Sequence, residues 1–265
     1  MNTDNLKLNN AFIRVHLRLF VDICPVYFRQ PLASFALFAA KYSLRGQGVI
    51  MGLPTVFGED TQKKLSGVSM STVVVTKKGG KVCIAADSLT SFGDLRMGAD
   101  YEAGHDKILV HDDSYLGIVG SAAHQLVMES IFKQDEIKVD FSSRLAVFET
   151  FRLLHPILKD KYFLNAKDED DDPYESTQID ALIACPHGIF GVHSLREVCE
   201  YKKFWAIGSG SEYALGAMYA VYDMLDSAEA IAKAGVMAGA EFNNASAMPM
   251  SSYTVDLVKL KSVSG

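Results

Sequence analysis

The residues around Ser71 could carry out hydrolytic chemistry. Met70 precedes Ser71 directly, and the run Thr72–Val75 that follows has the β-branched character of a strand. If the chain started at Met70 or were cut after it, Ser71 would carry a hydroxyl and a free α-amine on one residue. An α-amine has a pKa of roughly 7.7–8.0, so it can act as the base for its own hydroxyl near neutral pH. The pattern predicts an amide hydrolase with Ser71 as nucleophile.

The rest of the chain must supply the elements that hold Ser71. Runs of strands alternate with runs of helices, and this order predicts a four-layer α+β sandwich of two sheets. Pro156 is expected to bend or divide the second helix. Strand patterns cover residues 71–75, 81–86, 107–111, 115–119, 179–185, 188–193, 198–202, 204–207 and 251–261, and helical spacing covers 122–135, 142–164, 211–225 and 227–243.

Residues 1–70 differ in character from the rest of the chain. Charges such as Arg14, Arg18 and Asp22 interrupt their apolar runs, so neither a transmembrane helix nor a secretory signal is indicated. Two interpretations remain open: a propeptide removed before Ser71, or an upstream stretch read as coding although translation begins at Met70. We favour the second, and both leave a domain over residues 71–265.

Charge and cysteine usage narrow the class of protein. The 265 residues are 49% hydrophobic and carry a net charge of −6. Residues 1–70 hold eight Lys and Arg against four Asp and Glu, so the remainder carries about −10 and suits neither nucleic acid nor a membrane surface. The four cysteines lie far apart, which predicts a reduced, cytoplasmic protein. Neither they nor the histidines have ligand spacing, and we predict no metal and no cofactor.

Several motifs in a fixed order resemble the β-type subunits of the proteasome and its bacterial relatives, which are N-terminal nucleophile hydrolases. The resemblance runs from Ser71 to about Val258 and implies an αββα sandwich of two antiparallel sheets. The bacterial homologues look closer than the eukaryotic subunits. The matching pieces are Ser71-Thr72, the run Ile84–Ser88, Gly93, Lys107-Ile108, the run Gly117–Ala123 and the run Ala206–Ala214.

The resemblance also implies roles for individual residues. Ser71 is the nucleophile, and its spacing to Asp87 equals the family's spacing from nucleophile to conserved Asp. Lys107 matches the family's catalytic Lys. Its charge is expected to lower the pKa of the nucleophile hydroxyl, and Asp87 is expected to keep Lys107 charged. The backbone N–H of Gly120 is expected to form the oxyanion hole. The two supporting serines are Ser209, which binds the terminal amine, and Ser246.

Three positions depart from the family pattern. Ser71 stands where Thr is usual, so the methyl group that restricts the nucleophile rotamer is missing. Asn243 stands where an Asp is usual, and His124 where a further acidic residue is common. These departures predict weaker activity or an atypical substrate.

The resulting hypothesis is a cytoplasmic, cofactor-free peptidase subunit that cleaves polypeptides through an acyl-enzyme on Ser71. The resemblance implies a homo-oligomeric ring, supplied with unfolded substrate by an ATPase partner. Two alternatives stay open. One is a non-catalytic ring subunit in which residues 1–70 persist and bury the Ser71 amine, and the other is an N-terminal nucleophile hydrolase that acts on a small-molecule amide.

Overall fold

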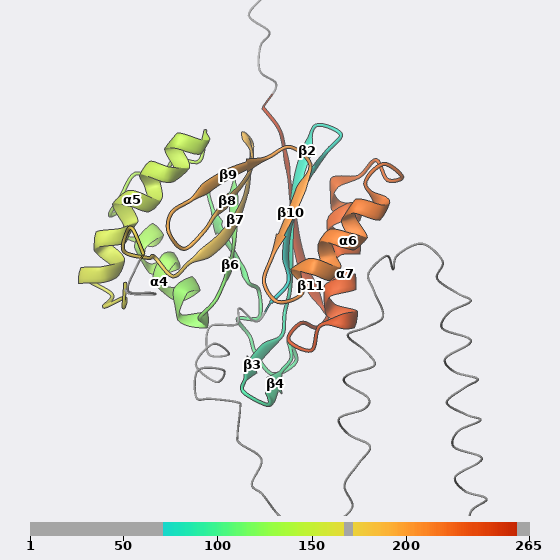
Figure 1. Cartoon of the computed structure of the whole chain (residues 1–265), viewed down its shortest axis with the longest axis horizontal. Coiled ribbons are helices and arrows are strands. Elements are labelled where there is room, and N and C mark those ends of the chain that lie inside the picture. The colour runs from blue at the N-terminus through green and yellow to red at the C-terminus, as the bar shows by residue number, and fades with distance from the viewer. Residues whose placement is uncertain (1–70, 167–171, 259–265) are drawn as a thin grey trace, which may run out of the picture. The chain divides into compact units, whose positions relative to one another are not determined.

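The computed structural model describes residues 71–166 and 172–258. The predicted extension over residues 1–70 and the end of the last predicted strand, residues 259–261, lie outside this part of the chain. Within it, two antiparallel sheets lie face to face, and a pair of helices covers the outer side of each (Figure 1).

The four-stranded sheet has the order β10-β1-β2-β11, with β1 and β2 in the middle. Val73, Val74 and Val75 of β1 are fully buried, as expected for β-branched side chains covered on both faces. Gly79 and Gly80 join β1 to β2 with φ of +60° and +75°, the backbone that a two-residue hairpin requires. The strands are β1 (Val73–Lys78), β2 (Lys81–Asp87), β10 (Phe204–Ile207) and β11 (Met250–Asp256).

The five-stranded sheet has the order β5-β6-β7-β8-β9, so β5 is an edge strand. The chain passes from this sheet to the other at Lys202 and Lys203, between β9 and β10. The strands are β5 (Ile108–His111), β6 (Ser114–Val119), β7 (Asp180–Cys185), β8 (Gly188–Val192) and β9 (Val198–Tyr201).

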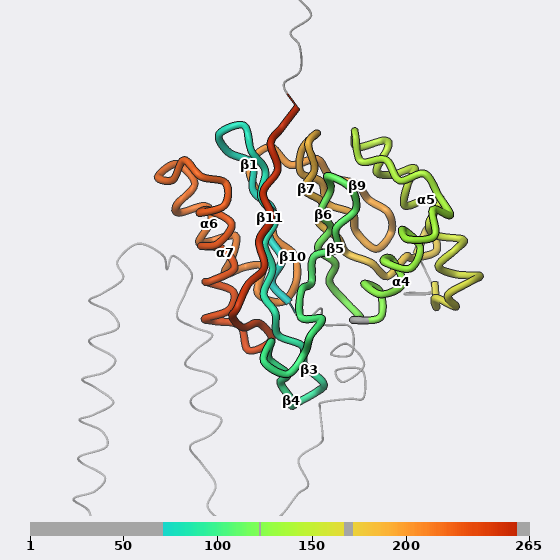
Figure 2. Tube along the Cα trace, turned by 180° about the vertical axis from the view of Figure 1, so that it is seen from behind, coloured from blue at the N-terminus to red at the C-terminus, as the bar shows by residue number. Residues whose placement is uncertain are grey.

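Four helices cover the outer faces of the sheets, as both views of the chain show (Figures 1 and 2). The helices α4 (Ala122–Lys133) and α5 (Arg144–Asp160) pack on the five-stranded sheet. The helices α6 (Ser211–Val221) and α7 (Ala228–Phe242) pack on the four-stranded sheet.

Three apolar clusters hold these parts together, and strand periodicity assigns residues to them. On β7, Ala181 and Ile183 face α4 and α5, whereas Leu182 and Ala184 face the other sheet. On β1, Val73 and Val75 face the five-stranded sheet, and Val74 faces α6 and α7. The cluster that contains Val73, Val75, Leu182 and Ala184 lies between the two sheets. It therefore holds the sheets together and fixes how β1 lies over β6 and β7.

The observed elements confirm the predicted mixture of antiparallel sheets and helices, with two differences. Pro156 does not divide α5, which continues to Asp160 because Leu154 and Leu158 on either side of it are buried in one cluster. A short hairpin, β3 (Thr90–Phe92) and β4 (Leu95–Met97), was not predicted. In the described part of the chain, no helix is long and apolar enough to cross a membrane.

Candidate active site

The pairing of β1 with β2 brings Ser71 and Asp87 to one end of the four-stranded sheet. Val73 lies opposite Ala86, so the residues just before Val73 lie beside Asp87. The backbone N–H of Asp87 donates to the carbonyl of Thr72 at 3.1 Å, and the backbone N–H of Thr72 donates to Asp87 Oδ1 at 2.8 Å. Ser71 is therefore anchored next to a carboxylate through its neighbour.

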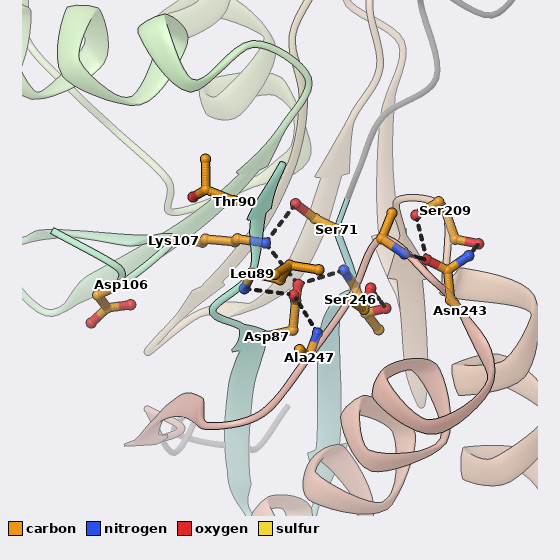
Figure 3. Close-up of polar contacts among 12 residues, drawn as sticks. Ser71, Asp87, Leu89, Thr90, Asp106, Lys107, Ser209, Asn243, Ser246 and Ala247 are labelled. Carbon is orange, nitrogen blue, oxygen red and sulfur yellow. Dashed lines mark hydrogen bonds and ion pairs between the residues drawn. The ribbon is translucent and has the colours of Figure 1, made fainter. Parts of the chain in front are cut away.

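The Asp87 carboxylate is fully buried and accepts from four donors (Figure 3). Oδ1 accepts from the Thr72 N–H and from Lys107 Nζ at 2.9 Å. Oδ2 accepts from the N–H groups of Leu89 at 3.0 Å and Ala247 at 3.1 Å. Donors on both oxygens suit a carboxylate and leave no place for an amide NH₂ group.

Lys107 joins this carboxylate to the candidate nucleophile. Its Nζ lies 3.1 Å from Ser71 Oγ and 2.9 Å from Asp87 Oδ1, and its side chain is only 12% exposed (Figure 3). Burial lowers the pKa of Lys107 below its usual value, while the charge and hydrogen bond of Asp87, and the charge of Glu102, oppose that shift. The three predicted residues Ser71, Asp87 and Lys107 thus form one contact network.

Thr72, the other hydroxyl of the predicted start, faces the core. Its side chain is fully buried, and its Oγ1 lies 2.8 Å from Ser246 Oγ. A Cβ on Gly210 or Gly239 would lie 1.9 Å or 2.4 Å from Thr72 Oγ1, so two backbone segments close over this hydroxyl. This environment leaves no room for a substrate carbonyl at Thr72, which favours Ser71 as the nucleophile.

Ser209 lies in the loop between β10 and α6 and bonds to Asn243, the residue after α7. Its hydroxyl donates to Asn243 Oδ1 at 2.9 Å, and Asn243 Nδ2 donates back to the Ser209 carbonyl at 3.0 Å. Gly210 N–H in the same loop donates to the Ser71 carbonyl at 3.3 Å. The loop therefore lies against Ser71, and the expected bond from Ser209 to the Ser71 amine stays a prediction.

Gly120 follows the last residue of β6 and has a φ of +120°, a conformation that favours glycine. Ile108 pairs with Gly117 in the antiparallel β5–β6 ladder. Continuing this register puts Gly120 at the same end of the sheet as Lys107. Its predicted role as the oxyanion donor fits that location and stays a prediction.

His124 lies in the first turn of α4, beside Gly120. A Cβ on Gly120 would lie 3.6 Å from its Nδ1, which is buried and has no hydrogen-bond partner among the described residues. Burial lowers the pKa of His124, so the ring is neutral near pH 7. An uncharged imidazole therefore stands at position 124, where an acidic residue is common in the family.

The cluster contains groups of the kinds that acyl transfer uses. It has a hydroxyl beside a cation, a buried carboxylate that holds the cation, and a turn into a helix close by. In the described part of the chain, no group of three or more His, Cys, Asp or Glu side chains could hold a metal ion.

Solved structures of known proteins share this fold. The structure of Thiobacillus denitrificans BPH in complex with epoxomicin is 43% identical in sequence, covers 71% of this chain and 100% of its own, and has a TM-score of 0.66. The chain belongs to the proteasome β-type family. A second BPH structure is 44% identical, with coverages of 71% and 98% and a TM-score of 0.66.

A more distant relative has the same fold. Eukaryotic HslV from Trypanosoma brucei is 19% identical and covers 70% of this chain and 99% of its own, with a TM-score of 0.52. A scan against protein-family models and a search of curated proteins found no match.

Sequence reasoning missed parts of the site that involve no motif. The bonds that Leu89 and Ala247 give to Asp87 come from backbone groups, which leave no trace in residue type. The contact between Thr72 and Ser246 joins positions 174 residues apart. The burial of Thr72 could have been predicted from strand alternation. Thr72 lies on the same face of the strand as Val74, which belongs to the core.

Proposed function

We propose that this proteasome β-type chain is a peptidase whose nucleophile is Ser71, exposed as the N-terminal residue when residues 1–70 are absent. The observation that carries the proposal is the position of Lys107 Nζ, 3.1 Å from Ser71 Oγ and 2.9 Å from Asp87 Oδ1. Such an ammonium favours the alkoxide form of the serine, and a buried carboxylate keeps the ammonium in place.

The proposed reaction begins with proton transfer from Ser71 Oγ to the Ser71 α-amine, directly or through a water molecule. Oγ attacks the peptide carbonyl, and the Gly120 N–H donates to the oxygen as it becomes negative. The amine then gives the proton to the leaving nitrogen, and an acyl-enzyme remains on Oγ. Water then attacks this ester and gives a proton to the amine. The C–Oγ bond breaks, Oγ takes that proton back from the amine, and the product acid leaves with Ser71 restored.

The proposal includes the architecture and the boundaries of the domain. We assign residues 71–265 to a four-layer αββα sandwich of the N-terminal nucleophile hydrolase type, and residues 1–70 to an extension outside the mature fold. BPH supports this division, because 71% of the present chain covers that protein completely. The part of the present chain that lies outside this match is long enough for an extension of about seventy residues.

Assembly and partners are proposed from family membership. We expect a cytoplasmic homo-oligomeric ring that encloses its active sites, acts on unfolded polypeptide and receives it from an ATPase. The chemistry described above requires no cofactor.

The test uses a chain produced with Ser71 as its first residue. We expect turnover of fluorogenic peptides and a mass increase equal to one epoxomicin after incubation with that inhibitor. Ser71→Ala keeps the amine and removes the hydroxyl, so it should show neither. Ser71→Thr keeps the hydroxyl and should retain both.

Two results would replace the proposal. A correctly started chain with neither turnover nor labelling would favour the structural ring subunit. Hydrolysis of small amides without labelling by the peptide-like inhibitor would favour the small-molecule amidohydrolase. Intact mass must confirm Ser71 as the first residue in each experiment.

A further inference from the structure

We propose that Asp106 is a positioning residue for Lys107, acting through hydrogen bonds from Tyr253 and Gln125. The inference rests on the proposed function, since it concerns how Lys107 reaches Ser71. Asp106 directly precedes Lys107 but neither touches Ser71 nor belongs to the Asp87 network among the contacts described above. Its importance comes from the elements that it joins.

Three bonds converge on Asp106. Tyr253 Oη on β11 donates to Oδ2, and the backbone N–H of Ile108 donates to Oδ1 at 2.9 Å. Gln125 Nε2 on α4 donates to the Asp106 carbonyl at 2.7 Å. One residue thus connects the start of β5 to a strand of the other sheet and to the helix that follows Gly120.

The bonds of Asp106 act just ahead of the first paired residue of β5. This edge strand has four residues and pairs on one side only, with β6, and Lys107 lies just before it. Ile108 and Leu109 are buried in the core, and a pocket of about 360 Å³ between β5 and α4 is lined by Asp106, Ile108 and Gln125 among others. The hydrogen bonds of Asp106 therefore hold the backbone beside Lys107, where the strand ladder has not yet begun.

Tyr253 is held by its backbone and by its ring. Its backbone on the edge strand β11 pairs with Ile84 of the inner strand β2, and its ring stacks on Tyr115 of β6 with centroids 4.8 Å apart. Asp106 raises the pKa of Tyr253 to about 12, so the phenol remains a donor at any pH at which the enzyme would work. Tyr253 therefore keeps the proton that it donates to Asp106.

The consequence is a restriction on the Lys107 backbone. A lysine side chain has four flexible bonds, so the position of Nζ depends both on its ion pair with Asp87 and on where its Cα is held. Misplacement of a reacting group by about 1 Å can lower a rate by about 100-fold. Partial loosening of one bond should give a smaller loss, of about tenfold, in kcat.

The test compares Tyr253→Phe, Asp106→Asn and the double variant in a chain that starts at Ser71. We expect each single variant to lower kcat about tenfold while KM changes less than about twofold. If both residues act through one bond, the double variant should be no slower than the slower single variant. Tyr222→Phe is the matched control, because it removes a tyrosine hydroxyl that donates at 2.7 Å to the carbonyl of Lys77. That control should leave kcat unchanged.

A second measurement is independent of turnover. Competitive acetylation followed by mass spectrometry should label Lys107 at least about threefold faster in Tyr253→Phe than in the parent chain, because a less restrained side chain exposes its neutral amine form to the reagent more often. Tyr222→Phe should label at the parent rate. If Asp106→Asn fails to fold, Tyr253→Phe decides the question alone.

The outcomes separate this inference from the proposed function. A parent chain without turnover in which Tyr253→Phe still accelerates labelling of Lys107 would refute the peptidase and support the positioning role. Unchanged labelling in Tyr253→Phe would overturn the positioning role whether or not the parent is active. Equal loss of kcat in Tyr253→Phe and Tyr222→Phe would also overturn it.

Discussion

Asp87 joins three distant parts of the chain at one carboxylate. Its oxygens bind the start of β1 through Thr72, the start of β5 through Lys107, and the loop before β11 through Ala247. The same side chain therefore organises the candidate site and stabilises the fold. Substitutions of Asp87 or its partners should therefore change both catalytic activity and stability, and the two must be measured separately.

Lys107→Met should strongly reduce peptide turnover and also weaken the fold. Removing the cation costs the transition state its electrostatic support, for which a fall in kcat of about 10²–10³-fold is expected. It also leaves the buried Asp87 charge without its ion partner, which typically costs about 3–5 kcal/mol. Three backbone donors remain on Asp87, so we expect the lower end of that range in the free energy of unfolding, measured by urea denaturation.

Lys107→Arg is the control for this experiment. It keeps the positive charge beside Asp87 but cannot present a single Nζ to Ser71, so it should recover stability more than activity. Full peptidase activity in Lys107→Met would refute the assignment.

The pH profile of kcat should be bell-shaped. The Ser71 amine must be neutral to act as the base, so activity should rise as the pH passes the amine pKa, which is ordinarily about 7.7–8.0. Lys107 is protonated only below its own pKa, which burial lowers, so activity should fall again as the pH passes that value. The alkaline limb should therefore lie below the ordinary lysine pKa of about 10.4. A rate that stays constant up to pH ~11 would argue against a charged Lys107.

At the scale of elements, the packing of α7 on β1 determines where Ser71, the proposed nucleophile, lies. Gly239 of α7 and Gly210 before α6 close over Thr72, and Thr72 positions Ser71 by its place in the chain. No side chain larger than hydrogen fits at these two positions. A change in the distance between α7 and β1 would therefore move Thr72 and, with it, Ser71.

Gly239→Ala and Gly216→Ala form a matched pair that tests this packing. Both glycines lie inside helices, where alanine is ordinarily the better residue by about 1 kcal/mol. A Cβ on Gly239 would lie 2.4 Å from Thr72 Oγ1, so we expect a loss of about 1–3 kcal/mol in stability, together with reduced kcat. Gly216 faces open space in α6, so its substitution should raise the melting temperature and leave kcat unchanged. Equal effects of both substitutions in thermal denaturation and peptide assays would refute the close approach.

Elements with a clear burial pattern or β-branched and aromatic runs could be predicted from sequence, and the short, exposed hairpin of β3 and β4 could not. The valines of β1 and the three-to-four spacing in α5 reflect burial on a defined face, which sequence records. The hairpin of β3 and β4 has three-residue strands, and its apolar Phe92 and Leu95 are exposed, so no burial pattern marks it. The contact from Tyr253 to Asp106 was equally invisible, because it joins residues 147 positions apart.

The apolar core of the described residues lies after Ser71. Within residues 71–166 and 172–258, three apolar clusters are assembled from residues between Val73 and Leu257. Burial of these side chains stabilises the sheets and helices. We predict that this is a self-sufficient core, so that removal of residues 1–70 leaves the fold intact.

A chain that starts at Ser71 should therefore unfold in one cooperative thermal transition. We also expect it to sediment as a multimer of its own subunit, at a mass that is independent of moderate dilution. Circular dichroism and sedimentation velocity measure the two properties. The full chain with Ser71→Ala is the reference, and loss of a cooperative transition on truncation would contradict the self-sufficient core.

Under the proposed function, the burial of Thr72 requires that the mature chain begin at Ser71 and at no neighbouring residue. One residue too many leaves Met70 on the amine and blocks the base. One residue too few puts the new amine on Thr72, whose hydroxyl is enclosed beneath Gly210 and Gly239 and bonded to Ser246. Thr72 therefore cannot replace Ser71 as the nucleophile. A preparation with mixed N-terminal residues would be partly inactive even if every molecule were folded. The active fraction of any sample should equal the fraction of molecules whose first residue is Ser71.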